Sequence, residues 1–209
     1  MLGPLVVAGV AVEDEDPLRE MGVRDSKKLT PSRRERLAKE IKKVAARTVT
    51  VVLSASDIDD GRTQATLNDL ELSAFVAVGR KLNVAQYVLD AADTSCERFG
   101  REFSRRLGRS PAPHVISIHR ADSLHPVVAA ASIIAKVERD RHVQRIAQRL
   151  QRRLNLPVGS GYPSDRVTVA YIRTYLEQEG ELPAEVRNSW KPVRGLLAQR
   201  NIRPLDRFH

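Results

Sequence analysis

Two aspartates stand where short apolar runs end, and they are the residues of this chain best placed for metal chemistry. Asp90 ends the run 87–89 and Asp122 follows the run Val115–His119. Functional side chains of α/β proteins gather at strand ends, and hard ions such as Mg²⁺ prefer oxygen ligands. Two such ions can hold the attacking and leaving oxygens of a phosphodiester. The pair therefore indicates a candidate metal site for phosphoryl chemistry.

A structural alternative is open for both aspartates. Asp90 could cap a helix that begins near Ser95, and Asp122 could cap a helix that begins near Pro126, because aspartate is common at helix N-termini. Asp93 could replace Asp90, although the capping role suits Asp93 better. Judged from spacing alone, capping is the favoured interpretation for both residues.

The elements that must position these residues alternate between strands and helices. Runs rich in Val and Thr predict strands at residues 5–12, 47–55, 85–90 and 115–119. Amphipathic or capped segments predict helices at residues 31–46, 66–82, 95–107, 126–154, 168–178 and 191–200. The pattern favours an α/β class with a mixed sheet flanked by helices. We expect a catalytic domain over residues 1–142 and a basic helical substrate-binding lobe with a tail over residues 143–209.

Composition favours a polyanionic partner and argues against several other classes of protein. The formal charge of +9 suits nucleic acid, because Lys and Arg near phosphates release counterions. A single cysteine, Cys96, excludes an internal disulfide and a zinc–cysteine cluster. No apolar run reaches membrane-spanning length, and residues 2–12 lack the pattern of a signal peptide. We therefore expect a cytoplasmic protein that does not act at a membrane.

Several segments of the chain carry motifs that belong together. They are Asp25–Thr30, Asp90–Asp93, His119–Asp122, Ala130–Asp140, Gly159–Asp165 and Arg187–Lys191. In this order they resemble ribonuclease HII of the archaeal type over nearly the whole chain. The resemblance implies the ribonuclease H fold, in which four carboxylates hold two Mg²⁺ or Mn²⁺ ions. It makes Asp90 and Asp122 two of these four catalytic and metal-binding acids, against the capping role that spacing favours.

The resemblance also implies a substrate and the residues that bind it. The substrate would be an RNA–DNA hybrid, or DNA with embedded ribonucleotides, cut by a monomeric enzyme of DNA replication and repair. The candidate substrate-binding residues are Ser26, Lys27, Lys28, Lys136, Arg139 and Tyr162. The cations would contact phosphates, which they do without reading sequence, and Tyr162 would pack on the deoxyribose at the junction. The alternatives are solvated helix residues for the cations and a core-covering loop aromatic for Tyr162.

One segment of the family does not occur in this sequence. The family carries Asp-Glu-Ala-Gly-Arg-Gly on a central first strand, just before an apolar strand that begins Gly-Pro-Leu. Here Gly3-Pro4-Leu5 follows only two residues. A start codon placed too late explains this better than a truncated gene, because the other motifs are intact. As written, the chain should be poorly stable, since strands 5–12 and 85–90 lose their shared partner. It should also cleave little, because two carboxylates position two ions and the attacking water less well than four do.

Two further interpretations concern the partners of the chain. Residues 202–209 resemble a degraded sliding-clamp-binding peptide, in which Ile202 replaces a glutamine and His209 replaces an aromatic residue. A packed or frayed terminus is the favoured alternative. The alternative to an endonuclease is a non-catalytic relative that binds hybrids, and cleavage of a duplex with one embedded ribonucleotide would separate the two.

Overall fold

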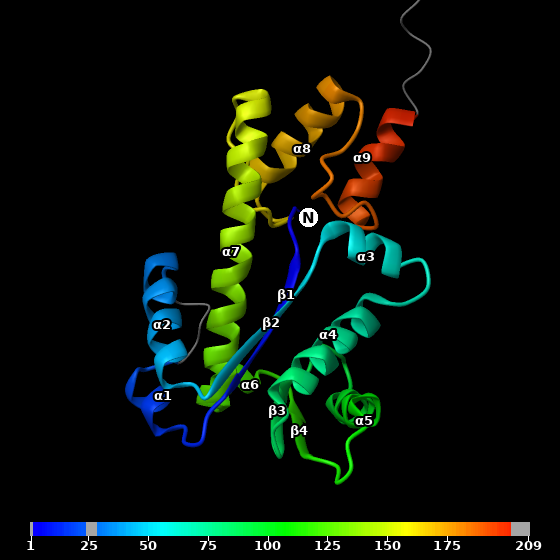
Figure 1. Cartoon of the computed structure of the whole chain (residues 1–209). Coiled ribbons are helices and arrows are strands. Elements are labelled where there is room, and N and C mark those ends of the chain that lie inside the picture. The colour runs from blue at the N-terminus through cyan, green and yellow to red at the C-terminus, as the bar shows by residue number, and fades with distance from the viewer. Residues whose placement is uncertain (1, 24–28, 202–209) are drawn as a thin grey trace, which may run out of the picture. The chain divides into compact units, whose positions relative to one another are not determined.

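The computed structural model describes residues 2–23 and 29–201 (Figure 1). The strands in this part of the chain are β1 (Leu5–Ala11), β2 (Arg47–Leu53), β3 (Gln86–Asp90) and β4 (His114–Ile118). The helices there are α1 (Asp16–Glu20), α2 (Pro31–Val44), α3 (Ala55–Gly61), α4 (Leu67–Leu82), α5 (Cys96–Leu107), α6 (Ala121–Leu124), α7 (Pro126–Leu154), α8 (Arg166–Glu179) and α9 (Lys191–Asn201). None of these helices has the length and apolar character needed to cross a membrane. The α/β class predicted from the alternating patterns is confirmed.

Side-chain caps explain where helices begin and one strand ends. The hydroxyl of Thr30 accepts a hydrogen bond from the Arg33 amide, and a proline at the first helical position confirms the predicted start of α2. Ser54 forms a capping box with Asp57 at the start of α3. This capping box ends β2 at Leu53, before the predicted end at residue 55.

The described chain forms two compact units. The strand unit consists of Val6–Val52 and Ala65–Arg139, and the helical unit consists of Met1–Leu5, Leu53–Gln64 and Asp140–His209. The long helix α7 contributes residues to both units. The two domains expected from the sequence, residues 1–142 and 143–209, stay a prediction.

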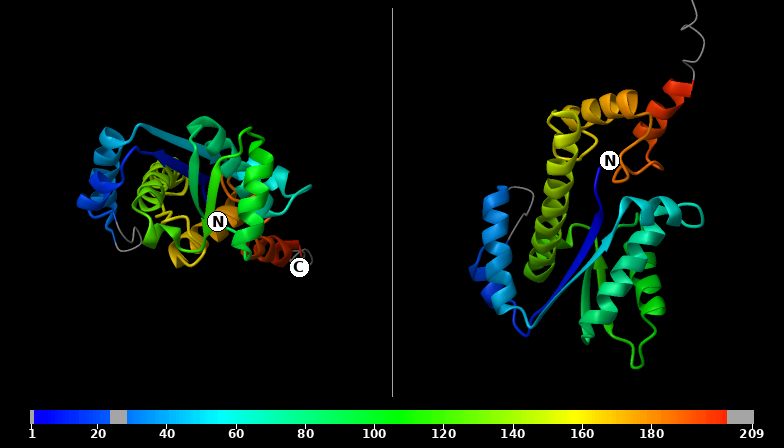
Figure 2. Two further views of the ribbon diagram at one scale, coloured as in Figure 1. Left: turned by 90° about the horizontal axis from the view of Figure 1, so that it is seen from below. Right: turned by 45° about the horizontal axis from the view of Figure 1, so that its top comes forward.

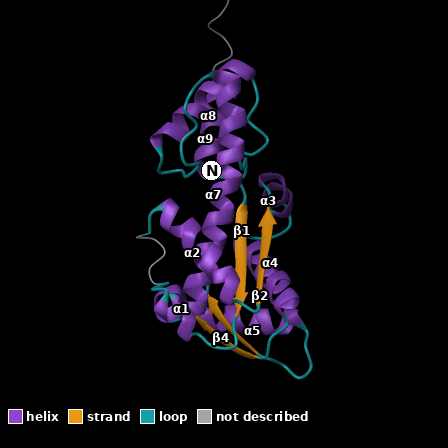
Figure 3. Ribbon diagram, turned by 60° about the vertical axis from the view of Figure 1, so that its left-hand side comes forward, coloured by secondary structure: helices purple, strands orange, loops and turns teal. Residues whose placement is uncertain are grey.

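The described strands form two separate two-stranded sheets (Figure 3). β1 and β2 pair in opposite directions, whereas β3 and β4 pair in parallel, with Tyr87 opposite Val115 and Asp90 opposite Ile118. Helix α5 contacts both α4 and β4 (Figure 2). The mixed arrangement is thus present as two half-sheets, and they are not hydrogen-bonded to each other in the described part of the chain.

The core of the strand unit lies on the apolar first half of α7. Ala130 and Ile133 are fully buried there, in one cluster with Leu37 and Ile41 of α2 and with Val10 of β1. Burial of such aliphatic side chains contributes roughly 1.5–3 kcal/mol each. This core fixes β1 and α2 against α7.

The helical unit packs around Tyr171 of α8. Its ring is 2% exposed, and its hydroxyl donates to the Leu150 carbonyl of α7. Burial raises the pKa of Tyr171. Leu2 is fully buried in the same cluster, and its amide donates to the Gly161 carbonyl at 3.0 Å. The first residues of the described chain are therefore part of the core of this unit.

The Arg187–Lys191 motif also has a structural role in the helical unit. Arg187 is buried, and its Nε donates to the Gly3 carbonyl. The amides of Asn188 and Ser189 both donate to the Asp59 carboxylate, at 2.7 and 2.9 Å. The motif therefore ties the segment before α9 to α3 and to the amino-terminal residues.

Candidate metal and nucleic-acid site

The carboxylate of Asp90 lies against the backbone segment that leads to Asp122 in the strand unit. Asp90 ends β3 opposite Ile118, the last residue of β4. The chain then turns at Arg120, which has a φ of 55°, and enters α6 with Asp122 in its first turn. The Oδ1 atom of Asp90 accepts a hydrogen bond from the Ala121 amide at 3.2 Å. The structure thus places the Asp90 carboxylate against the residue that precedes Asp122.

The capping role that spacing favoured is wrong for both aspartates. Ser95 is the N-cap of α5, and Asp122 lies inside α6 instead of capping α7. Asp93 supports the start of α5, because its carboxylate accepts from the Ser95 amide and pairs with Arg98. The hydrogen bond from the Ser95 amide, followed by the pairing with Arg98, lowers the pKa of Asp93 although burial opposes the shift. Asp93 is therefore structural, and Asp90 remains a candidate ligand.

The turn that presents Asp122 depends on a residue that the sequence does not single out. Arg120 adopts the left-handed conformation, which is uncommon for residues other than glycine, asparagine and aspartate. The Nε2 atom of His119 lies 3.3 Å from the carbonyl oxygen of Thr94. This contact also ties the turn to the loop after β3. No sequence signal marks an arginine for this conformation.

The pair of carboxylates suits a divalent cation in chemistry and in surroundings. Asp122 is only 8% exposed, and Asp90 is half-buried. A buried carboxylate is costly unless a positive charge or hydrogen bonds compensate it, and Mg²⁺ and Mn²⁺ take oxygen ligands. Within residues 2–23 and 29–201, no group of three or more Asp, Glu, His or Cys residues is placed to hold a metal. Asp90 and Asp122 therefore stay candidate ligands for such an ion.

The predicted substrate-binding residues fall in different parts of the chain. Ser26, Lys27 and Lys28 lie outside the described residues, as do residues 202–209. Lys136 and Arg139 lie on α7 in the strand unit, where Lys136 is half-buried and Arg139 is buried. Tyr162 lies in the helical unit, and its ring is 40% exposed. Its ring is therefore accessible rather than packed into the core, while the binding roles of all these residues stay predictions.

Hydrogen bonds to Asp165 hold the loop that carries Tyr162. The carboxylate accepts from the amide and the hydroxyl of Ser160, at 2.6 and 2.8 Å. It also caps α8 by accepting from the Val167 amide at 2.9 Å. These bonds, those from Ser160 foremost, lower the pKa of Asp165 to about 2. The ionised carboxylate therefore keeps both ends of the Gly159–Asp165 loop together.

We expect this loop to loosen when Asp165 loses its charge. Its folded pKa of about 2 lies below the ordinary 3.8, so its contribution to stability is complete above about pH 4 and is lost as the pH falls toward 2. Asp165→Ala should lower the free energy of unfolding by about 1–2 kcal/mol at neutral pH, because the N-cap is lost.

Urea titrations at several pH values measure this effect, with Asp165→Asn as the matched control. Asparagine is also a good N-cap, so this variant should lose less stability at neutral pH than the alanine variant does. Hydrogen exchange at the Ser160 amide should quicken in Asp165→Ala. An unchanged acid dependence of stability in that variant would contradict the assignment.

Comparison with known proteins finds relatives along the whole chain. The model of the ribonuclease HII family matches residues 1–193. Ribonuclease HII of Methanoregula boonei is 41% identical over 208 residues, a match that covers 100% of this chain and 94% of the relative.

Solved structures share the fold at similar levels of identity. Ribonuclease H2 from Pyrococcus horikoshii superposes with a TM-score of 0.86 at 33% identity, covering 96% of this chain and 92% of the other. Ribonuclease HII from Archaeoglobus fulgidus, solved in a complex with PCNA, gives a TM-score of 0.83 at 39% identity and covers 93% and 90%. The fold is therefore ribonuclease H-like, and this chain belongs to the ribonuclease HII family.

Proposed function

We propose that this protein is an endonuclease that hydrolyses the RNA strand of RNA–DNA hybrids, including ribonucleotides embedded in DNA. The observation that carries the proposal is the hydrogen bond from the amide of Ala121, the residue before Asp122, to the carboxylate of Asp90. Membership of the ribonuclease HII family supplies the reaction class. The proposal includes a cytoplasmic location and a monomeric state.

The chemistry follows from what the two carboxylates can hold. Two Mg²⁺ or Mn²⁺ ions, when bound, would activate a water and stabilise the leaving 3′-oxygen, which gives a 5′-phosphate product. Asp90 would be a ligand whose orientation is fixed by the Ala121 amide. Asp122 would hold its carboxylate in buried surroundings, where a nearby cation compensates its charge.

The substrate would be held mainly through its backbone. The proposed phosphate contacts are Ser26, Lys27, Lys28, Lys136 and Arg139, and the net charge of +9 supports a polyanionic ligand. Tyr162 would pack on the deoxyribose at the junction, which its exposed ring permits. A sliding clamp is a weaker proposed partner through residues 202–209, supported by the relative solved with PCNA.

We propose further that the chain as written is impaired. Within the described residues, no group of three or more potential metal ligands is found, and the two half-sheets are not joined there. Two carboxylates orient two ions less well than four, and a misplacement of about 1 Å can cost about a hundredfold in rate.

A cleavage assay tests both parts of this proposal. The substrates are a duplex with one embedded ribonucleotide, an RNA–DNA hybrid and an all-DNA duplex, each with Mg²⁺, Mn²⁺ or a chelator. The comparison is with an extended chain, in which an apolar strand containing Asp-Glu-Ala-Gly-Arg-Gly precedes residue 1. We expect metal-dependent cutting at ribonucleotides by the extended chain, and cutting about a hundredfold slower by the chain as written.

Each outcome decides a different part of the proposal. Equal turnover by the two forms would contradict the impairment. Metal-independent binding of hybrids without cleavage by either form would contradict the endonuclease and favour the non-catalytic alternative.

A further inference from the structure

We propose that the exposed face of α2 is a separate contact surface for double-stranded DNA, which binds the phosphate backbone whether or not a ribonucleotide is present. Helix α2 carries six cationic residues and two acidic ones. Five of these cations are exposed, namely Arg33, Arg36, Lys39, Lys42 and Lys43. The phosphate contacts proposed above all lie outside this helix, so the surface is additional to them.

The exposed cations of α2 have no acidic partner in the described part of the chain. None of the five side chains forms an ion pair with a described residue. Glu35 stands four residues before Lys39, and Glu40 stands four residues after Arg36. Pairs at this spacing can form on a helix surface, but these two do not. The positive charge of the face is therefore not neutralised within the described chain.

Helix α5 of the same unit shows the opposite arrangement. Its exposed Arg101 pairs with Glu97, and its exposed Arg105 pairs with Glu102 at 2.8 Å. A carboxylate this close cancels most of the field that a more distant phosphate would experience. The two helices therefore differ in how much of their positive charge is available to a partner, and α5 supplies a natural control.

The cations form a row opposite the buried face of α2. Arg36, Lys39 and Lys43 are three and four residues apart, which places them on one side of a helix. Leu37 and Ile41 are buried on the other side, in the cluster built on α7 (Figure 1). At about 1.5 Å per residue, the row from Arg36 to Lys43 is about 10 Å long. Phosphates of one DNA strand advance about 3.4 Å each along the axis, so the row spans about three of them.

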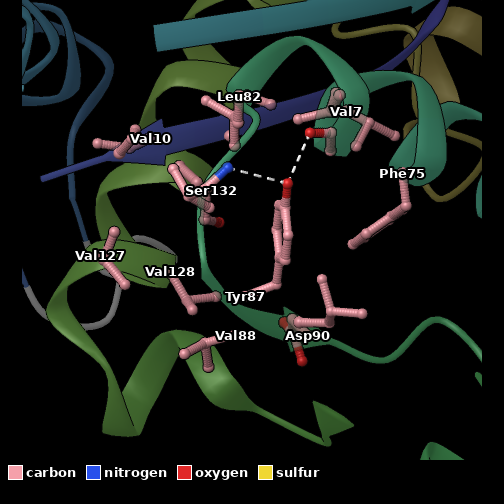
Figure 4. Close-up of a pocket in the computed structure, with 18 of the residues that line it drawn as sticks. Val7, Val10, Phe75, Leu82, Tyr87, Val88, Asp90, Val127, Val128 and Ser132 are labelled. Carbon is pink, nitrogen blue, oxygen red and sulfur yellow. Dashed lines mark hydrogen bonds between the residues drawn. The ribbon is translucent and has the colours of Figure 1, made fainter. Parts of the chain in front are cut away.

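The apolar side of α2 is already used by the core. Val10 of β1 belongs to the same cluster, Val127 of α7 packs against it, and both also line a neighbouring cavity (Figure 4). A helix that binds a membrane surface must present its apolar face to lipid, whereas α2 keeps Leu37 and Ile41 inside the protein. The helix also contains no aromatic residue on which single-stranded bases could stack. A duplex backbone is therefore the polyanion that this face fits.

Binding through this face depends neither on sequence nor on metal. Phosphate contacts fix the position of a protein on a duplex but read no bases, and they let proteins slide along DNA. The surface therefore holds the protein on DNA that contains no site of cleavage. The inference concerns binding alone, so it does not require the proposed hydrolysis.

A short all-DNA duplex in the presence of a chelator is the direct probe. Its affinity for the chain as written is measured by fluorescence anisotropy at several salt concentrations. Arg36→Gln combined with Lys39→Gln removes two charges from the row, and glutamine is a good helix former. We expect the slope of log K against log[salt] to become shallower by about two. The affinity should fall about tenfold or more at about 0.1 M salt.

Arg101→Gln combined with Arg105→Gln is the matched control, because it removes the same charge from α5. This variant should keep the slope and most of the affinity. Arg36→Lys combined with Lys39→Arg keeps both charges of the row and should bind as the unchanged chain does. Circular dichroism checks that each variant folds.

A second pair of substitutions keeps the test decisive if the first variant does not fold. Arg33→Gln combined with Lys43→Gln removes two other exposed cations of α2 and should make the slope shallower by a similar amount.

Three outcomes would overturn the proposal. An equal change of slope in the α2 and α5 variants would show an effect of net charge alone. An unchanged slope in the α2 variants would show that the row is only a solvated helix face. Binding to phosphatidylserine vesicles that the α2 variants lose, with DNA binding unchanged, would assign the face to a membrane surface. All these readouts use uncleaved DNA or lipid, so they remain interpretable if the proposed hydrolysis fails its own test.

Discussion

In the extended chain, Asp90→Asn and Asp122→Asn should each slow cleavage at an embedded ribonucleotide by about a hundredfold or more. Asparagine keeps the size of the side chain but removes the negative charge that a divalent cation requires. Asp90 also accepts a hydrogen bond from the backbone amide of Ala121. The side-chain oxygen of asparagine can accept the same bond, so Asp90→Asn keeps the local geometry and removes only the charge. Single-turnover rates at several Mn²⁺ concentrations measure the effect, and both variants should need more Mn²⁺ for half-maximal rate.

Asp93→Asn is the matched control for these variants. It removes a carboxylate from the same segment, but this carboxylate is already occupied by the Ser95 amide and by Arg98. We expect a lower free energy of unfolding and an unchanged dependence of the rate on Mn²⁺. If Asp93→Asn instead abolished cleavage while Asp90→Asn did not, the assignment of Asp90 would be wrong.

Local sequence signals predicted most elements because caps and β-branched runs act over a few residues. Thr30 and Pro31 mark the start of α2, and the run that ends at Asp90 forms β3. Spacing misled only where a nearby residue competed. Ser95 is the N-cap of α5. Asp122 lies inside the additional helix α6, which precedes α7, so neither aspartate caps the helix that spacing assigned to it.

The arrangement of the site depended on tertiary features that spacing does not encode. Asp90 meets the residue before Asp122 because Arg120 turns in the left-handed region and aims the Ala121 amide at the carboxylate. The family resemblance predicts that both acids bind metal, and this role stays a prediction. The assignment of Leu53–Gln64 to the helical unit has no local sequence signal, since this segment lies far along the chain from α8 and α9.

The largest effect on stability is expected from Phe99→Ala in the strand unit. Phe99 is 2% exposed, and its ring meets that of Phe75 edge-on with centroids 5.2 Å apart. Removing a buried aromatic ring leaves a cavity and costs about 3–5 kcal/mol. Urea unfolding of the chain as written measures the loss as a lower midpoint, and Phe99→Leu, which refills part of the space, should lose less.

The same substitution tests whether packing and metal chemistry are separable in this unit. Helix α5 lies tightly on β4, because a Cβ atom on Gly100 would come within 2.9 Å of Ser117, and β4 in turn pairs with the strand that ends at Asp90. Phe99→Ala leaves both carboxylates and the Ala121 amide in place. Well below its unfolding temperature, the extended chain carrying it should therefore need no more Mn²⁺ for cleavage than the unchanged extended chain. A rise in that requirement as large as for Asp90→Asn would mean that the packing of α5 on β4 itself sets the positions of the carboxylates.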